Sequence, residues 1–374
     1  MAPTRRPGKP PTIVLEHSPA YEMLMSIVVA TVNDPETYEV GAEWLADVRT
    51  RAGEELISRI REASLGDEDT FSHLTGLVHD TPAPRDIPAF LRHLRETDAD
   101  EIRLHLVQFY AREVRRMTPP TVIRAAIDGD PDARREFLRT SYPDWEPWTS
   151  YLTRVVDADG EALKRDLIGV LEEWADRVWN RESLTIMPII ERDADAKRAL
   201  ARELPIDRFV TTATNGVEFA PRPGIDRLVM VPSFVNRPLV TYYEFGETMV
   251  IVYPVADESV TAETDAPPLR LVRLSKALGD EKRLRILRAL AEGEKTLMEL
   301  AETFGVAKTT MHHHMIVLRS AGLVSVGVGS KRYRLRTETV PDVGSLLSGY
   351  LGAATGPSAA SGSPAPSRRR RAAS

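Results

Sequence analysis

Apolar positions recur with the period of a helix through most of the first two hundred residues. Segments such as AYEMLMSIVVATV, EIRLHLVQFYAREVRRM and EALKRDLIGVLEEWADRVWN place apolar side chains three and four residues apart, as amphipathic or buried helices do. Proline and Asp-Gly pairs interrupt the pattern at Pro119-Pro120, Gly129-Asp130-Pro131 and Asp159-Gly160. The pattern predicts a mostly helical region from about residue 19 to residue 204.

The apolar runs become shorter near Pro205. Five runs rich in β-branched and aromatic residues follow: RFVTTAT, GVEFAP, RLVMVPS, LVTYYEF and TMVIVYPV. Asn-Gly, Pro-Gly, Arg-Pro and Gly-Glu pairs separate these runs, and such pairs are typical of turns. The spacing predicts four or five short strands that pair in sequence as a small antiparallel sheet.

A compact helical pattern begins at residue 269. The segment LRLVRLSKALGD places its leucines on one helical face, and Asp280 is a suitable N-cap for the next helix, EKRLRILRALAEG. We expect that next helix to bury Leu284, Leu287, Leu290 and Ala291. Two further helical segments, TLMELAETFG and KTTMHHHMIVLRSAG, are separated by only two or three residues. Two short helices joined by a tight turn predict a helix-turn-helix.

The segment LVSVGVGSKRYRLR, which follows these helices, alternates like a hairpin. A two-residue turn at Gly329-Ser330 would place Arg332, Arg334 and Arg336 on one face. The helices, the helix-turn-helix and the basic hairpin together predict a winged helix. In that arrangement the second helix enters the major groove of DNA and the hairpin contacts phosphates.

These patterns predict an α+β protein, with a mainly helical N-terminal region followed by a small antiparallel sheet and then a C-terminal winged helix. The predicted organisation is a disordered lead at 1–11, an N-terminal domain at 12–255, a linker at 256–268, a winged helix-turn-helix at 269–354 and a disordered basic tail at 355–374. The N-terminal domain is the natural place for effector binding or oligomerisation.

Charge is unevenly distributed along the chain. Residues 269–337 contain 14 lysines and arginines against 6 acidic residues, whereas residues 1–268 contain 31 against 47. A basic C-terminal module is typical of a surface that meets something anionic. A solvated basic surface is the alternative reading, and a winged helix used only for protein contacts fits the charge less well.

Cysteine is absent, which excludes disulfides, thiolate metal sites and thiol nucleophiles. The start of the chain, MAPTRRPGKPP, is polar and proline-rich, unlike a secretory signal. No apolar run reaches the roughly 18 residues that a membrane span needs. We therefore expect a cytoplasmic protein with no membrane association.

Three consecutive histidines, His312, His313 and His314, raise the question of a metal site. Side chains about 100° apart around a helix cannot share one ion, and chelation from a helix needs partners four residues apart. His314 lies beside the face of Met311, Met315 and Leu318, which predicts a packed side chain. His312 and His313 lie on the opposite face, where contact with a DNA groove is the favoured interpretation and a plain solvated face the main alternative.

The segments LSKALGDEKRLRILRAL and LMELAETFGVAKTTMHHHMIVLRSAGLV, with the following hairpin, resemble the ArsR/SmtB family of bacterial winged-helix repressors. The resemblance covers about residues 270–336. It implies a homodimer that binds double-stranded DNA and leaves its operator when an effector binds, and a bacterial protein that lies at the nucleoid when bound. It also implies which residues contact DNA: Lys308, Thr309, Thr310, His312 and His313 in the groove, and Lys331, Arg332 and Arg334 on the wing.

Departures from the family pattern bear on the effector. Metal-sensing members place a cysteine pair where this chain has Thr296 and Met298, and the segment after the hairpin, PDVGSLLSGYLGA, lacks the histidine of a second family site. We expect no metal or other cofactor at these sites, which leaves control by a small organic effector, by a protein partner or by the abundance of the protein itself. Ala307 stands where a capping hydroxyl is usual. The last helix carries an apolar stripe that favours dimer formation: Val343, Leu346, Leu347, Tyr350 and Leu351.

The N-terminal region shows no nucleotide-binding loop or nucleophile elbow. His73, His79 and Asp80 have poor spacing for a metal site, so chance placement is the simpler interpretation. The aromatic cluster within YPDWEPWTSYL is more typical of an interhelical corner than of a ligand site. The leading hypothesis is a sequence-specific transcription regulator, a repressor and not an enzyme. The alternative is an enzyme that acts on a small molecule and uses the winged helix as a DNA tether or autoregulator.

Overall fold

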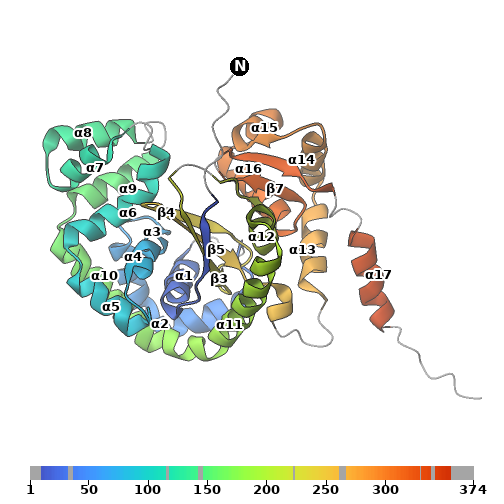
Figure 1. Ribbon diagram of the computed structural model, residues 1–374, viewed down its shortest axis with the longest axis horizontal. Coiled ribbons are helices and arrows are strands. Elements are labelled where there is room, and N and C mark those ends of the chain that lie inside the picture. Colours follow the sequence, from blue (N-terminus) through green and yellow to red (C-terminus); the bar gives the residue numbers. More distant parts are fainter. Residues whose placement is uncertain are drawn as a thin grey trace, which may run out of the picture.

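The computed structural model describes residues 10–32, 37–114, 118–141, 146–221, 224–260, 267–328, 330–337 and 342–354 (Figure 1). The predicted tail at 355–374, residues 1–9 of the predicted lead and residues 261–266 of the predicted linker lie outside the described residues. Helices make up most of the described chain, in agreement with the helical periodicity of the sequence.

A four-stranded sheet lies at the centre of the N-terminal region. In spatial order its strands are β1 (Thr12–Leu15), β3 (Arg227–Ser233), β5 (Thr248–Pro254) and β4 (Thr241–Phe245). β1, β3 and β5 are parallel, and β4 is antiparallel to β5. The prediction of an antiparallel sheet is therefore wrong, because the sheet is mixed. Local turn signals reveal the β4–β5 hairpin, but β1 reaches the sheet from across a long helical segment and can join it in parallel.

The run RFVTTAT was predicted to be a strand, and this is also wrong. It lies in α12 (Ile206–Ala213), which buries Phe209, Val210 and Ala213. These positions are one and four residues apart, so they form one helical face, and packing of that face on the sheet overrides the strand preference of the individual residues.

Helices cover both faces of the central sheet (Figure 1). On one face α1 (Pro19–Thr31), α3 (Thr70–His73) and α4 (Thr75–Asp80) pack in the largest apolar core together with Val229 and Val250. On the other face α12 and α11 (Asn180–Glu203) enclose a second core with alternate residues of the same strands, among them Leu228, Met230 and Ile251. The alternation along each strand thus separates the two cores.

Further helices surround the first core. They are α2 (Ala42–Ala63), α5 (Ile87–Glu96), α6 (Ala99–Val114), α7 (Pro120–Ile127), α8 (Pro131–Thr140), α9 (Glu146–Asp157) and α10 (Gly160–Trp174), which the π-helical turn η2 (Ala175–Trp179) joins to α11. Asp130 and Asp159 lie in two of the predicted breaks. Their carboxylates accept hydrogen bonds from the first turns of α8 and α10, so the breaks are helix N-caps.

The described part of the C-terminal unit consists of five helices and three strands, and the three strands belong to a second sheet. Its elements are α13 (Leu269–Leu278), α14 (Glu281–Ala291), β6 (Lys295–Thr296), α15 (Leu297–Phe304), α16 (Lys308–Ser320), β7 (Val324–Gly327), β8 (Arg332–Leu335) and α17 (Asp342–Ala354). The predicted core stripe of α14 is partly wrong. Leu290 is buried as predicted, but Leu284 is 47% exposed and Ala291 is also exposed, while Ile286, which was not predicted, is buried. The α14 sequence is apolar on more than one side, so packing against α13 and β8 decides which side is buried.

Two sets of contacts attach this unit to the N-terminal region. The short strand β2 (Val217–Glu218) pairs in parallel with β7, which gives the second sheet the order β2-β7-β8-β6. Arg273 of α13 donates hydrogen bonds of 2.5–2.6 Å to both oxygens of Glu39, and it also reaches Asp257 of the short helix η3 (Asp257–Ser259) at 3.0–3.1 Å. Ionic contacts and sheet pairing therefore hold the two regions together in the folded chain.

Candidate nucleic-acid interface

The predicted helix-turn-helix is present as α15, a short turn and α16. Thr296 caps α15 in a capping box, in which its hydroxyl accepts from the Glu299 N–H while the Glu299 carboxylate accepts from the Thr296 N–H. Gly305 ends α15 in the left-handed conformation, at φ 61°, which glycine adopts without a steric cost. Ala307 then precedes α16 with no side-chain cap, as the sequence predicts.

One face of α16 is buried and the other is open. Met311, His314, Met315 and Leu318 point into the C-terminal core. The five residues that the resemblance assigns to the groove are all exposed: Lys308, Thr309, Thr310, His312 and His313. The exposed face therefore begins at the N-terminal turn of the helix, the part that commonly reaches base edges in a helix-turn-helix.

The three histidines do not converge. His314 is 9% exposed, and burial followed by the charge of neighbouring arginine and lysine residues lowers its pKa despite the opposing effect of Asp280. Partial removal of the His312 ring from water also lowers its pKa, and the positive charges of Arg319 and Lys308 lower it further. The His312 imidazole is therefore neutral near pH 7 and offers one hydrogen-bond donor and one acceptor. Among the described residues, no group of three or more potential ligands could hold a metal ion.

The predicted hairpin forms from β7 and β8, with Ser325 opposite Arg334 and Val326 opposite Tyr333. The connection between the strands covers residues 328–331 and is longer than the predicted two-residue turn, of which Gly329 lies outside the described residues. Lys331 is exposed and adopts a left-handed backbone, with φ 51°. Its N–H donates to the Gly327 carbonyl at 3.0 Å, which closes the longer loop.

The arginines of the hairpin already have acidic or carbonyl partners. Arg332 donates to the Glu294 carbonyl at 2.7 Å and lies 3.4 Å from the Glu299 carboxylate. Arg334 forms an ion pair with Glu218 of β2, and its Nε lies 4.0 Å from Glu294. Both side chains are partly exposed, at 39% and 53%. Contact with phosphate would therefore have to compete with these intramolecular ion pairs.

The segment around β2 contacts the C-terminal unit through polar side chains, a role that the sequence alone does not indicate. The Glu218 carboxylate accepts from the Ser325 hydroxyl at 2.6 Å as well as from Arg334. Burial alone would raise the pKa of Glu218, but these hydrogen bonds and the charges of Arg334 and Arg336 outweigh it, so the pKa is lowered. Asn215 donates to the Ser320 carbonyl at the end of α16, at 3.1 Å. The run GVEFAP was predicted to be a strand of the small sheet, and β2 does lie within it, but β2 pairs with β7 in the second sheet instead.

Residues 280–326 match the family model described as bacterial regulatory protein, arsR family. The C-terminal unit carries an ArsR-type helix-turn-helix. The matched residues run from the N-cap of α14 into β7 and include all of α15 and α16. Neither the curated proteins nor the solved structures give a match to the chain.

The ArsR-type helix-turn-helix indicates a DNA-binding regulator.

Thr296 and Met298, the positions of the family's thiolate pair, lie at the start of α15, where Thr296 is a cap and Met298 is 49% exposed. In the N-terminal region His73 is buried in the first core, and its ring centroid lies 6.2 Å from that of Tyr151. Within the described part of the chain, no helix combines the length and apolar character that crossing a membrane requires.

Proposed function

We propose that this protein is a transcription regulator that represses its target genes by binding a specific operator as a homodimer. The observation that carries the proposal is the exposed N-terminal face of α16, from Lys308 to His313, within an ArsR-type helix-turn-helix. In this proposal α16 lies in the major groove and its polar side chains contact base edges. The β7–β8 hairpin acts as the wing on the flanking phosphates.

The proposed DNA contacts fall into two classes. Thr309, Thr310, His312 and His313 carry hydrogen-bond donors and acceptors suited to bases, whereas Lys308, Lys331, Arg332 and Arg334 carry charges suited to phosphate. Charge of this kind supplies affinity for any DNA sequence, and contacts with base edges supply specificity. The two classes should therefore respond differently to substitution.

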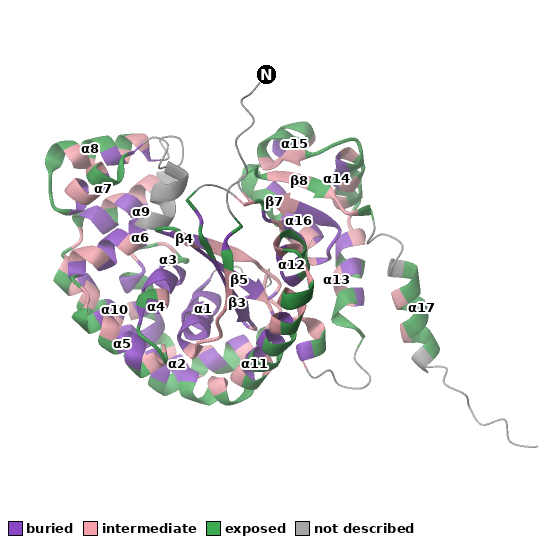
Figure 2. Ribbon diagram, in the orientation of Figure 1, coloured by how far each residue is buried: buried purple, intermediate pink, exposed green. Residues whose placement is uncertain are grey.

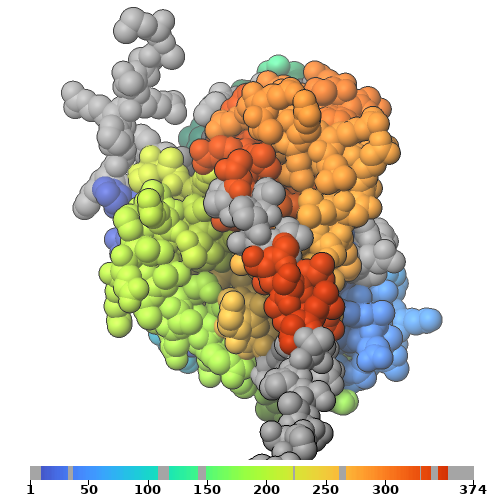
Figure 3. Space-filling model, turned by 90° about the vertical axis from the view of Figure 1, so that its right-hand side faces the viewer, coloured from blue at the N-terminus to red at the C-terminus, as the bar shows by residue number. Residues whose placement is uncertain are grey.

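Support for a dimer comes from α17. Leu346 packs against the C-terminal core, whereas Leu347 and Leu351 are 46% and 55% exposed. Figure 2 shows α17 mostly in the colours of exposed and intermediate residues. In the view of Figure 3, α17 lies on the outer surface of the molecule. Pairing of this helix with its counterpart would bury the exposed leucines and present two copies of α16 to an inverted repeat.

The test is a binding titration of the full-length chain with its operator and with unrelated duplex DNA over a range of salt concentrations. We expect His313→Ala to weaken operator binding more than non-specific binding. Arg332→Ala should weaken both about equally and reduce the salt slope by about one. Arg288→Ala serves as the control, because this 85% exposed arginine of α14 lies outside the proposed interface.

If the His313 and Arg332 variants both bind operator as tightly as the parent at moderate salt, the assignment of the interface is wrong. Repression is tested separately, with a reporter gene downstream of the operator. Expression should rise when the protein is removed, and a fall in expression would instead identify an activator.

A further inference from the structure

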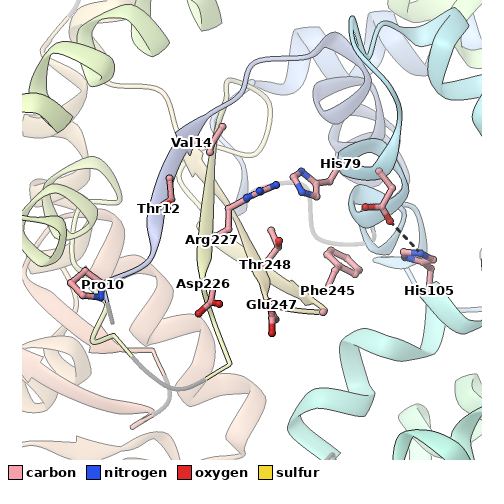
Figure 4. Close-up of a pocket in the computed structure, with 12 residues that line it drawn as sticks. Pro10, Thr12, Val14, His79, His105, Asp226, Arg227, Phe245, Glu247 and Thr248 are labelled. Carbon is pink, nitrogen blue, oxygen red and sulfur yellow. Dashed lines mark ion pairs between the residues drawn. The ribbon is translucent and has the colours of Figure 1, made fainter. Parts of the chain in front are cut away.

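A cavity of about 820 Å³ lies at the amino ends of the parallel strands of the central sheet (Figure 4). Its floor comes from β1, β3 and β5, and its walls come from α4, from α6 and from the β4–β5 turn. This volume is within the usual range for sites that bind small organic molecules. The residues that line it include His79, Asp80, His105 and Arg227.

The floor of the cavity is a polar row on an otherwise apolar face. Strand pairing aligns Thr12 with Arg227, Arg227 with Thr248, and Thr248 with Phe245. Two residues further along, the same face carries Val14 beside the buried Val229, Val250 and Tyr243. The apolar core thus stops one row before the sheet ends, and two hydroxyls, a guanidinium and an aromatic ring take its place.

Arg227 is the one lysine or arginine among the residues that line the cavity. Its side chain is exposed to the cavity and extends across the floor in the direction of His79 (Figure 4). Among the described residues its guanidinium forms no hydrogen bond or ion pair. A planar guanidinium with free donors beside threonine hydroxyls is suited to two parallel hydrogen bonds with a carboxylate.

His79 and His105 lie in the wall of the cavity opposite Arg227. The Nδ1 atoms of His79 and His105 are buried with no hydrogen-bond partner among the described residues. A carboxylate oxygen of Glu16 lies 3.7 Å from Nδ1 of His79, and Asp80 lies 3.9 Å from Nε2 of His105. Burial lowers the pKa of His105 against the opposing charge of Asp80, so its ring is neutral near pH 7. The His105 ring also lies 5.6 Å from that of Phe245, which gives this wall an apolar surface.

We propose that this cavity binds a small organic monocarboxylate. Arg227 holds the carboxylate together with the hydroxyls of Thr12 and Thr248, and the apolar body of the ligand lies against Phe245 and His105. Asp80, Asp226 and Glu247 also line the cavity and repel additional negative charge. That repulsion opposes every anion, and it weakens the binding of a phosphate dianion more than that of a monocarboxylate. The role of this cavity as the effector site of a regulator rests on the proposed function, but binding of the carboxylate to the cavity does not depend on DNA.

Isothermal titration calorimetry on the full-length chain, without DNA, tests the proposal separately from the regulator assignment. The probes are benzoate, 3-phenylpropionate and phenylalanine, each titrated to about 10 mM, because a weak fragment-like ligand is expected to bind in the millimolar range. The amide of 3-phenylpropionate and inorganic phosphate are the comparison ligands. We expect at least one carboxylate to bind and the amide and phosphate to bind more weakly.

The Arg227→Gln variant should weaken binding of that carboxylate by about tenfold or more, because the charged hydrogen-bonding partner is lost. Arg208→Gln is the matched control, since it removes an exposed arginine of α12 that does not line the cavity. Thermal unfolding of each variant checks that the fold is intact. Three results would overturn the proposal: no carboxylate binds, Arg227→Gln binds as tightly as the parent, or the amide or phosphate binds as tightly as the carboxylate.

Discussion

Substitution of Glu218 by glutamine should make the protein bind DNA more tightly. Glu218 belongs to the N-terminal region, yet its carboxylate occupies Arg334, a residue of the proposed phosphate-binding hairpin. Glutamine keeps an oxygen that can accept from Ser325 and retains the shape of the side chain, so β2 should stay paired with β7. The substitution removes the negative charge that competes with phosphate for Arg334.

The expected effect is modest and can be worked out from the exposure of the pair. The two side chains are 53% and 34% exposed, and an ion pair in that setting contributes about 0.2–1 kcal/mol. Release of Arg334 should therefore tighten binding by about 1.4-fold to 5-fold. One more phosphate contact should steepen the dependence of log K on log salt by about 0.9, so the gain should be larger at low salt. Glu294, at 4.0 Å from Arg334, remains as a weaker competitor.

Fluorescence anisotropy with labelled operator and with unrelated duplex DNA, from about 50 to 200 mM salt, measures both quantities. Glu203→Gln is the control for net charge, since it removes an exposed carboxylate at the end of α11, away from the hairpin. The gain should appear for both DNAs, because phosphate carries no sequence information. Affinity and salt slope equal to those of the Glu203 control would show that Glu218 does not compete with DNA for Arg334.

Three further predictions concern assembly, pH and metal. Leu351→Lys should shift the dimer towards monomer in light scattering, whereas Leu184→Lys, at a 77% exposed leucine of α11, should not; a parent that is monomeric at micromolar concentration would contradict the dimer. Burial raises the pKa of Glu22 to about 7, because it outweighs the hydrogen bonds that favour the charged carboxylate. The melting temperature of the parent should therefore fall as pH rises from about 4.5 through 7, whereas that of Glu22→Gln should not, and parallel plots of melting temperature against pH would refute this. Zinc, nickel, copper and cadmium at low micromolar levels should not release the operator; stoichiometric release that is lost on replacing His73 would reveal a metal site.

The helix-turn-helix could be predicted from the sequence because its signals are local. The N-cap at Asp280, the left-handed Gly305 and the apolar spacing of Met311, Met315 and Leu318 lie within forty residues, and each decides the conformation of its own neighbourhood. The same reasoning predicts that His314 is packed, and the structure confirms this.

The central sheet could not be predicted in the same way. β1 has four residues and joins a strand more than two hundred residues later, so nothing near Thr12 indicates its partner Arg227. The cavity was missed for the same reason, because its floor exists only after β1, β3 and β5 are aligned. The run GVEFAP predicted a strand at Glu218, but the role of Glu218 depends on the partner strand β7, which lies about one hundred residues later in the chain.

The pairing of β2 with β7 also determines where the chain can be divided. A fragment that begins after the predicted linker at 256–268 would keep the whole family match, but it would leave the edge of β7 at Val324–Gly327 without its neighbouring strand. Such an edge offers unpaired backbone groups next to apolar side chains and is a template for aggregation. Arg273 would at the same time lose both of its carboxylate partners. A soluble fragment for DNA-binding studies should therefore keep the segment from Asn215 to Glu218 attached through a designed connection, or place charged residues along the exposed edge of β7.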